Sequence, residues 1–210
     1  MKDLLKLARL DETQAGADPT GIPLQLAPTD PRTLAVDALH DVRALGPTRP
    51  VTLTGPDDGT PASAAALADE AALRQVVSNL VGNSIAHAPA GSPIRIGVGT
   101  SDGHAVLEVA DQGRGLPQEQ ADRVFERCYR AGSSRTGTTG AGLGLSIVQS
   151  LVSAHRGRVE LRTAPGQRAV FRVLLPRAAD MASRAQRVPR LTGLGAVEVE
   201  ACWPARLAGG

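Results

Sequence analysis

Aromatic residues are almost absent from this chain. Phe125, Tyr129, Phe171 and Trp203 are the only ones among 210 residues, although 42% of the residues are hydrophobic. A buried core of ordinary size is therefore possible, but it has to be built from Leu, Val, Ile and Ala. The length suits one domain of ordinary size, with or without tails.

Lysine is confined to the start of the chain, at Lys2 and Lys6. Nearly all other positive charge comes from arginine, so a phosphate-binding site further along has to use arginine side chains or backbone N–H groups. The net charge is +2, which is too small to favour a nucleic acid or an anionic membrane as a partner.

Cysteine and long apolar runs are also scarce. Cys128 and Cys202 form no CxxC pair, which excludes a disulfide framework and a typical zinc site. Two thiols without a pairing pattern are typical of a reducing compartment. No stretch reaches the roughly 18 apolar residues of a membrane-spanning helix, and residues 1–10 lack the apolar centre of a signal peptide. We therefore expect a soluble, cytoplasmic chain.

The spacing of apolar residues predicts helices and strands in alternation. Helices are expected at 31–45, 69–88, 117–129 and 142–155. Strands are expected at 22–26, 50–54, 94–98, 105–109, 158–163 and 169–176, with hairpin turns after 98 and after 163. Residues 130–141, rich in Gly, Ser and Thr, are expected to form a flexible loop.

The two ends of the chain lack a complete pattern. Residues 2–10 carry a leucine stripe that is too short for a stable helix, so it is interpreted as the end of a longer helix, followed by a polar loop to residue 21. Residues 177–210 have no clear period and are expected to be loosely ordered. The domain proper is expected at 22–176.

Two asparagines stand out in the strongest predicted helix. Asn79 and Asn83 are four residues apart, so they share a face that borders the apolar stripe. Asparagine is a mediocre helix former, and its carbonyl oxygen suits Mg²⁺, which keeps several waters and borrows substrate phosphates. The pair therefore indicates a polar cleft, with two solvated side chains as the alternative.

The segment DQGRGLP at 111–117 directly follows a predicted strand. The Asp111 carboxylate at the strand end could accept a hydrogen bond from a ligand amine. Gly113 and Gly115 would let the backbone approach a planar ring closely. An ordinary Asp-Gly turn is the alternative.

Glycines alternate in the segment TGAGLGLSIV at 139–148, where a helix is predicted to open. Free N–H groups at a helix start suit phosphate. The spacing is neither that of a P-loop nor that of a dinucleotide fingerprint. Arg130 and Arg135 precede the glycines and could bridge phosphate oxygens. A glycine hinge beside a solvated loop is the alternative.

Together these segments resemble, in order, the motifs of the catalytic ATP-binding domain of sensor histidine kinases, which are Bergerat-fold ATPases like gyrase and the mismatch-repair ATPases. LRQVVSNLVGNSIAHAP resembles the N box, VADQGRGLP the first glycine box, FERCYRAGSSR the F box and GAGLGLSIV the second glycine box. The resemblance extends roughly from Leu4 to Pro176. It implies an α/β sandwich, with a mixed sheet of about five strands covered by helices on one face.

The resemblance also implies roles for individual residues. Asn83 would hold Mg²⁺, and Asn79 would lie beside the phosphates of ATP, where related ATPases use a Glu to activate water. An Asn cannot act as a general base, which suits a kinase that must spare ATP from water. His87 would pack on the adenine, and Asp111 would bind its amino group.

The glycine-rich segments would surround the nucleotide. Gly113 and Gly115 would pass under the base, and Arg130 would reach phosphate. Gly140, Gly142 and Gly144, with Leu143 and Leu145 between and beside them, would anchor an ATP lid at about residues 130–141.

Several positions depart from the family pattern. Ala86 stands where the family usually has Lys or Arg, and Cys128 replaces the usual Phe. Arg156 and Arg168 stand where glycine is common, which could weaken nucleotide binding. The phosphoacceptor helix, with its His-Glu/Asp-x-Arg-Thr-Pro motif, would precede residue 4 and is expected to lie outside this chain, so residues 1–21 would be the end of a dimerisation helix and a linker.

Three functions remain open at this point. The first is a histidine-kinase module that transfers the γ-phosphate of ATP to a histidine supplied by another domain, with a response regulator as the next partner. The second is a serine kinase of the anti-sigma-factor type, and the third is a non-catalytic nucleotide-binding fragment. Fold alone does not decide among them.

Overall fold

A five-stranded mixed sheet forms the centre of the fold. The computed structural model describes residues 22–45, 48–127, 129 and 142–180. The strand order is β2 (Val51–Thr54), β4 (Ile94–Ser101), β5 (His104–Asp111), β7 (Ala169–Pro176) and β6 (Arg158–Arg162). β2 runs parallel to β4, and the other neighbours are antiparallel. The expected mixed sheet is confirmed.

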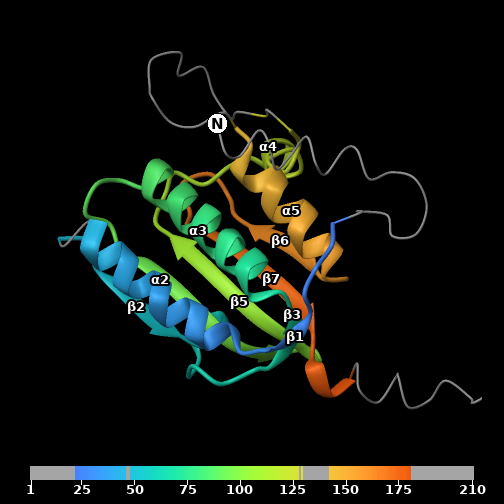
Figure 1. The fold of residues 1–210 in the computed structure, drawn as a ribbon. Helices are drawn as coiled ribbons and strands as arrows, with labels where there is room; N and C mark the ends of the chain where they lie inside the picture. Colours follow the sequence, from blue (N-terminus) through green and yellow to red (C-terminus); the bar gives the residue numbers. More distant parts are fainter. Residues whose placement is uncertain (1–21, 46–47, 128, 130–141, 181–210) are drawn as a thin grey trace, which may run out of the picture.

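Three helices cover one face of this sheet (Figure 1). They are α2 (Pro31–Leu45), α3 (Glu70–His87) and α5 (Gly144–Ala154). α3 lies between the other two and packs against both. The fold is thus the two-layer sandwich that the motifs implied.

Helix α3 begins and ends where its sequence dictates. The Asp69 side chain accepts a hydrogen bond from the backbone N–H of Ala72, a cap worth about 1 kcal/mol. The apolar face follows at Leu73, Val76, Val77, Leu80 and Val81, all of them buried. The helix stops before Pro89, which cannot continue it. Its direction fixes where Asn79, Asn83 and His87 lie.

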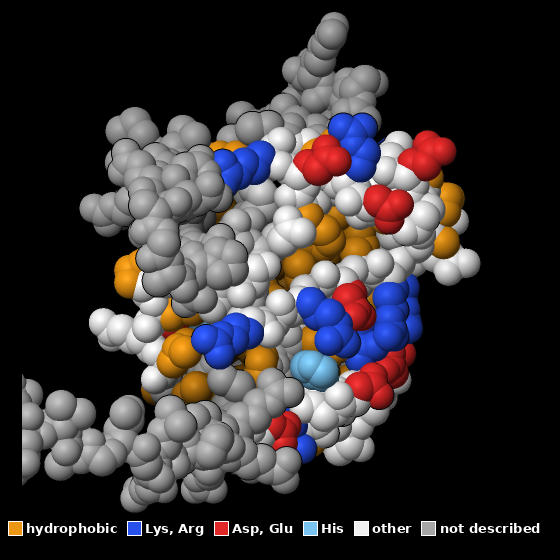
Figure 2. Space-filling model, turned by 90° about the vertical axis from the view of Figure 1, so that its right-hand side faces the viewer, with side chains coloured by type: hydrophobic (Ala, Val, Ile, Leu, Met, Phe, Trp, Pro, Cys, Tyr) orange, Lys and Arg blue, Asp and Glu red, His pale blue; other side chains and the backbone are white. Residues whose placement is uncertain are grey.

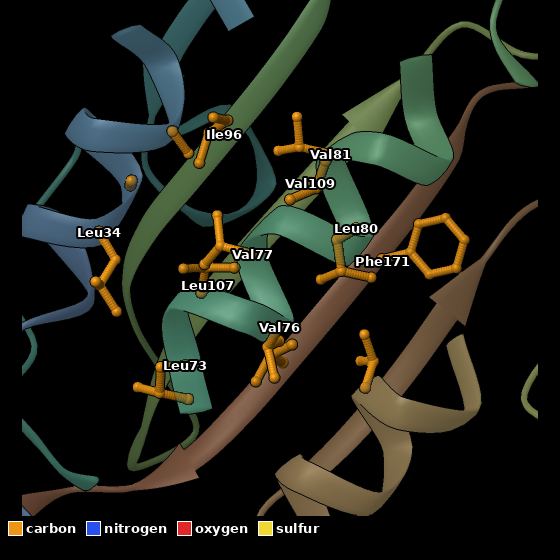
Figure 3. Packing of buried hydrophobic residues seen from close by; sticks show 14 of the residues in the cluster. Leu34, Leu73, Val76, Val77, Leu80, Val81, Ile96, Leu107, Val109 and Phe171 are labelled. Carbon is orange, nitrogen blue, oxygen red and sulfur yellow. The ribbon is translucent and has the colours of Figure 1, made fainter. Parts of the chain in front are cut away.

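The core is aliphatic, as the scarcity of aromatic residues predicted. Side chains of α3 point toward Leu107 and Val109 of β5 and toward Phe171 of β7 (Figure 3). Phe171 is the one aromatic residue that is fully buried among the described residues. The core therefore lies between α3 and the middle strands, directly behind the candidate site residues.

A small second sheet was not predicted. Residues 22–26 were expected to form a strand, but that prediction is wrong. The strand is β1 (Ala27–Thr29), which pairs antiparallel with β3 (Ala66–Ala68). Three-residue strands are too short to show an alternating pattern, and their partners are far apart in the sequence, so pairing rather than local preference decides their position.

The helix predicted at 117–129 is also too long. Only α4 (Gln118–Ala121) is helical. The following turns are closed by i→i+3 bonds, from the N–H of Arg123 to Gln120 and from that of Glu126 to Arg123. Phe125 packs edge-on against Phe171, with 6.5 Å between ring centroids. This tertiary contact outweighs the local helical preference.

The ends of α3 and α5 that lie away from the glycine motifs are tied together by His155. Its Nδ1–H donates to the Leu151 carbonyl at 2.6 Å, and its Nε2 accepts from the Asp69 N–H at 3.0 Å. Burial alone would raise the pKa of the Asp69 carboxyl, but N–H bonds from Ala72 and Gln25 outweigh burial and lower it. His155 thus fixes the packing of two helices.

Arg156 ends helix α5 in a conformation that favours glycine. Its φ is 57°, and the N–H groups of Arg156 and Gly157 bond back to Ser153 and Val152, which is the Schellman arrangement with glycine as the usual residue. We expect Arg156→Gly to raise the free energy of unfolding by about 0.5–1 kcal/mol, because relief of the left-handed strain exceeds the extra chain entropy of glycine.

Chemical denaturation of the purified variant measures this change. Gly157→Ala is the opposite control, because a Cβ there would lie 2.5 Å from the Leu174 carbonyl oxygen. It should destabilise the chain. A lower stability for Arg156→Gly would contradict this account of the helix end.

Candidate functional site

The Asn79 side chain joins α3 to the start of α5. Its Nδ2 donates to the Gly144 carbonyl at 3.3 Å, and its Oδ1 accepts from Gln75 Nε2 at 3.0 Å. A Cβ placed on Gly144 would lie 4.0 Å from the Asn79 side chain. The structure therefore brings the first asparagine of the pair onto the second glycine motif.

The strand β5 extends beyond the predicted end at residue 109, so Asp111 is its last residue, and this residue is 4% exposed. Its Oδ1 accepts the backbone N–H of Gly113 at 2.8 Å. This bond directs Oδ1 toward the turn, and we take Oδ2 as the oxygen that would accept from a ligand. A Cβ on Gly113 would lie 3.6 Å from the His87 carbonyl oxygen, so this turn lies against the end of α3.

Gly115 packs against the turn between β6 and β7. Its φ is +64°, and a Cβ there would lie 1.9 Å from the Ala164 carbonyl oxygen and 2.6 Å from that of Gln167. The Gly166 N–H also donates to the Arg114 carbonyl at 2.7 Å. The close approach at Gly115 is thus made to the backbone of this chain.

Helix α5 opens without a side-chain cap. Its N-cap residue Leu143 makes no side-chain cap bond, and the first turn holds no acidic residue. N–H groups in the first turn of such a helix lack intrahelical partners, and the helix dipole favours an anion there. The Leu143 side chain is buried in the core and Leu145 packs against it, so their contribution to binding would come from the backbone.

The predicted site residues thus fall into two contact groups joined by α3. Asn79 meets Gly144 near the middle of α3, and His87 lies next to Gly113 and Asp111 at its end. Asn83 lies one turn after Asn79 and is half-buried, and the His87 side chain is exposed. Arg130, Gly140 and the lid at about 130–141 lie outside the described residues, as do residues 1–21 and 181–210.

Two supporting residues were missed by sequence reasoning. Gln75 holds the Asn79 carbonyl oxygen, and the Thr163 hydroxyl accepts the N–H of Leu116 at 3.1 Å. Gln75 could have been found, because it lies one helical turn before Asn79. Thr163 could not, because its partner is 47 residues away in the sequence.

The arrangement offers a buried carboxylate, a helix start without a side-chain cap and an amide-bearing helix face, and α3 contacts both glycine motifs. No group of three His, Cys, Asp or Glu side chains able to hold a metal ion occurs in the described part of the chain. A cation bound here would need ligand oxygens in addition to asparagine, which is the coordination that Mg²⁺ accepts. The donor set therefore fits Mg²⁺ bound together with phosphate.

Comparison with known proteins gives one consistent result. Residues 68–179, just over half of the chain, match the family described as "Histidine kinase-, DNA gyrase B-, and HSP90-like ATPase". The probable sensor histidine kinase TcrY of Mycobacterium tuberculosis is 38% identical over 177 residues, which cover 84% of this chain and 34% of that protein. The chain thus spans about a third of the length of this relative.

Solved structures agree with the sequence comparison. The mycobacterial sensor histidine kinase MprB matches with a TM-score of 0.63 and 27% identity, covering 72% of this chain and 98% of that one. Full-length ShkA in complex with AMPPNP matches with a TM-score of 0.65 and 30% identity, covering 84% of this chain and 35% of that one. None of the helices within the described ranges is long and apolar enough to cross a bilayer.

Proposed function

The chain belongs to the histidine kinase-, DNA gyrase B- and HSP90-like ATPase family, and from this premise we propose that it is the ATP-binding catalytic module of a two-component sensor histidine kinase. It would transfer the γ-phosphate of ATP to a histidine of a phosphoacceptor domain, from which a response regulator takes the phosphoryl group. We propose that this transfer takes place in the cytoplasm, because a sequence with two cysteines and no CxxC pattern is typical of a reducing compartment.

One observation carries the proposal: α3 contacts both glycine motifs. Asn79 donates to Gly144 at 3.3 Å, and the end of the helix lies against Gly113, whose N–H holds Asp111. A ligand with an amine-bearing ring at one end and phosphates at the other matches the carboxylate and the free helix start. Adenosine triphosphate is such a ligand, and the comparison with a structure described with AMPPNP supports this choice.

Each residue has one task in this proposal. The Asp111 carboxylate accepts the adenine amine, while His87 covers the base. Asn83 supplies an oxygen to Mg²⁺, and N–H groups from Gly142 to Leu145 bind phosphate. Asn79 orients the start of α5. Its neutral amide cannot accept a proton from water, so it does not promote the hydrolysis of ATP. Gly140 and Arg130 would complete the lid.

Calorimetry with ATP and Mg²⁺ tests nucleotide binding. We expect saturable binding that weakens without Mg²⁺, and we expect Asn83→Ala to abolish most of that Mg²⁺ dependence. Ser78→Ala is the matched control, because Ser78 is exposed on the same helix. No heat at millimolar nucleotide would contradict the proposal.

Phosphotransfer separates the candidate activities. The chain alone, with labelled ATP and Mg²⁺, should carry no acid-labile phosphate, because none of its four histidines can easily lie in line with the γ-phosphate. His155 is buried, and His87 belongs to the proposed nucleotide site. His40 lies on α2, and His104 opens β5 at the end opposite Asp111. An added phosphoacceptor domain should become labelled slowly, since no tether raises its local concentration. Acid-stable label on an added anti-sigma-factor antagonist would instead indicate a serine kinase.

A further inference from the structure

A cavity lies on the outer face of the sheet, away from the helices. Its volume is about 300 Å³, and it is lined by Asp57, Arg95, Glu108, Arg162, Thr163, Gln167, Arg168 and Val170. Figure 2, in which the helical layer lies to the left, shows basic and acidic side chains gathered on the right, on the side of this outer face. None of these residues belongs to the nucleotide motifs.

The loop after β2 builds one wall of the cavity. Gly97 and Gly99 of β4 carry no side chain, so the loop lies close: a Cβ on Gly97 would be 3.0 Å from the Gly55 carbonyl, and one on Gly99 would be 2.8 Å from Pro56. Asp57 and Asp58 are held there in left-handed conformations, with φ of 52° and 67°. The loop thereby presents two carboxylates to the arginines of β4, β6, β7 and the turn before β7.

Positive charge exceeds negative charge around this cavity. Asp58 is shared between Arg95 and Arg168. Asp57 is shared between Arg162 at 3.0 Å and Arg172 at 3.6 Å.

Glu108 is already occupied. Its Oε1 lies 2.7 Å from Nε of the buried Arg172, and its Oε2 accepts the Asp57 N–H at 3.2 Å. Three carboxylates thus face four guanidinium groups, and one positive charge is left over.

Arg95 lies near a like charge. Burial lowers the pKa of Arg95, and the positive charge of Arg168 lowers it further, while Glu108 only partly opposes these effects. A cluster built only to hold the loop would gain stability from a carboxylate for each arginine. Here two like charges, Arg95 and Arg168, lie beside an open cavity.

The hydrogen-bond donors around the cavity also favour an anion as its ligand. Within the described part of the chain, Arg162 and Arg168 each make one side-chain hydrogen bond, both through Nη1. A guanidinium carries five N–H donors, so most of theirs remain for a ligand. Their side chains are 56% and 50% exposed, so they can turn toward one. The Thr163 hydroxyl accepts from Leu116 and can still donate its own proton.

We propose that this outer-face cavity is a binding site for a small polyoxygen anion of the phosphate class, held by Arg162, Arg168 and Thr163. The anion supplies the negative charge that the cluster lacks. The proposed site lies against the turn of residues 163–168. The other side of this turn contacts Gly115 and Leu116 of the first glycine motif. The site is separate from the start of α5 and does not depend on nucleotide binding.

Inorganic phosphate, titrated at constant ionic strength, is the probe. We expect saturable binding, with backbone amide shifts by nuclear magnetic resonance in the turn of the unmodified chain, at Thr163, Ala164, Gly166, Gln167 and Arg168. The double variant Arg162→Gln, Arg168→Gln should bind at least about tenfold more weakly, since it loses charge-assisted hydrogen bonds.

Arg158→Gln is the matched control. Arg158 lies on the same face of β6 and is 53% exposed, but it pairs with Glu160 and does not line the cavity. It should bind phosphate like the unmodified chain. Equal losses in both variants, shifts confined to the start of α5, or no saturable binding would overturn the proposal. If the double variant fails to fold, the location of the shifts in the unmodified chain decides.

Discussion

Replacing Gly115 with alanine is expected to lower the free energy of unfolding by about 2–5 kcal/mol, even without any ligand. The added Cβ would lie 1.9 Å from the Ala164 carbonyl oxygen, which belongs to backbone and cannot swing away. Moving the turn costs about 1–3 kcal/mol, as overpacking does, and the left-handed φ of +64° adds about 1–2 kcal/mol for an L-residue.

Thermal unfolding measures this loss, which corresponds to roughly 4–20 °C in a chain of this size. Gly166→Ala is the matched control. Gly166 lies in the turn that Gly115 contacts and has a φ of +74°, but no atom lies within 4 Å of its added Cβ. Gly166→Ala should therefore lower the free energy of unfolding only through the backbone conformation, by about 1–2 kcal/mol. Equal melting temperatures for the two variants would rule out the clash.

The same experiment separates two explanations of Gly115. The motif implied that Gly115 is small so that a base can lie on it. The contacts with Ala164 and Gln167 give a reason that needs no ligand. If the base were the only reason, Gly115→Ala would weaken nucleotide binding and lower the melting temperature no more than Gly166→Ala does, through the backbone conformation alone. We expect a clearly larger fall for Gly115→Ala.

The sequence predicted those parts of the fold whose patterns are local. Helix α3 has its cap, its apolar face and its terminating proline within 21 residues, from Asp69 to Pro89. The hairpin of β4 and β5 has its turn at Asp102 and Gly103, both with positive φ, directly between two apolar runs. In both cases periodicity and turn chemistry agree, and the expected elements form.

The features that were missed depend on long-range pairing. β1 and β3 pair over a long sequence separation, 41 residues from Ala27 to Ala68 and 37 from Thr29 to Ala66, and no local signal marks either strand. Glu108 and Arg172 are lone charges within apolar strands, and the sheet register places them opposite each other. Each charge could be noticed in the sequence, but their pairing required the order of the strands.

The candidate site was predicted as separate motifs, and the structure adds how they are held. Nothing in the sequence around Asn79 indicates that its amide reaches Gly144, which is 65 residues away. Nor does DQGRGLP indicate that Gly113 donates to Asp111 rather than to a ligand. The residue types were therefore accessible from sequence, while their orientation was not.

That orientation makes Asp111→Asn a sharp test of the proposed function. We expect the variant to bind ATP about 10- to 100-fold more weakly, because a hydrogen bond to a charged group contributes about 1.5–3 kcal/mol. The Gly113 N–H already holds Oδ1, so the amide oxygen of asparagine would take that place. Its NH₂ group would then face the adenine amine, donor against donor.

The same change should favour guanine, whose O6 accepts a hydrogen bond where adenine carries its amine. Calorimetry with ATP and GTP in Mg²⁺ should therefore show a preference for ATP that narrows by at least about tenfold. Stability without nucleotide should not fall, because Gly113 keeps its acceptor and a neutral amide is cheaper to bury than a carboxylate. Asp102→Asn, at the exposed turn before β5, is the control and should change neither affinity. An unchanged ratio of ATP to GTP affinity in Asp111→Asn would remove Asp111 from the base-binding role, whatever the fate of the phosphate contacts.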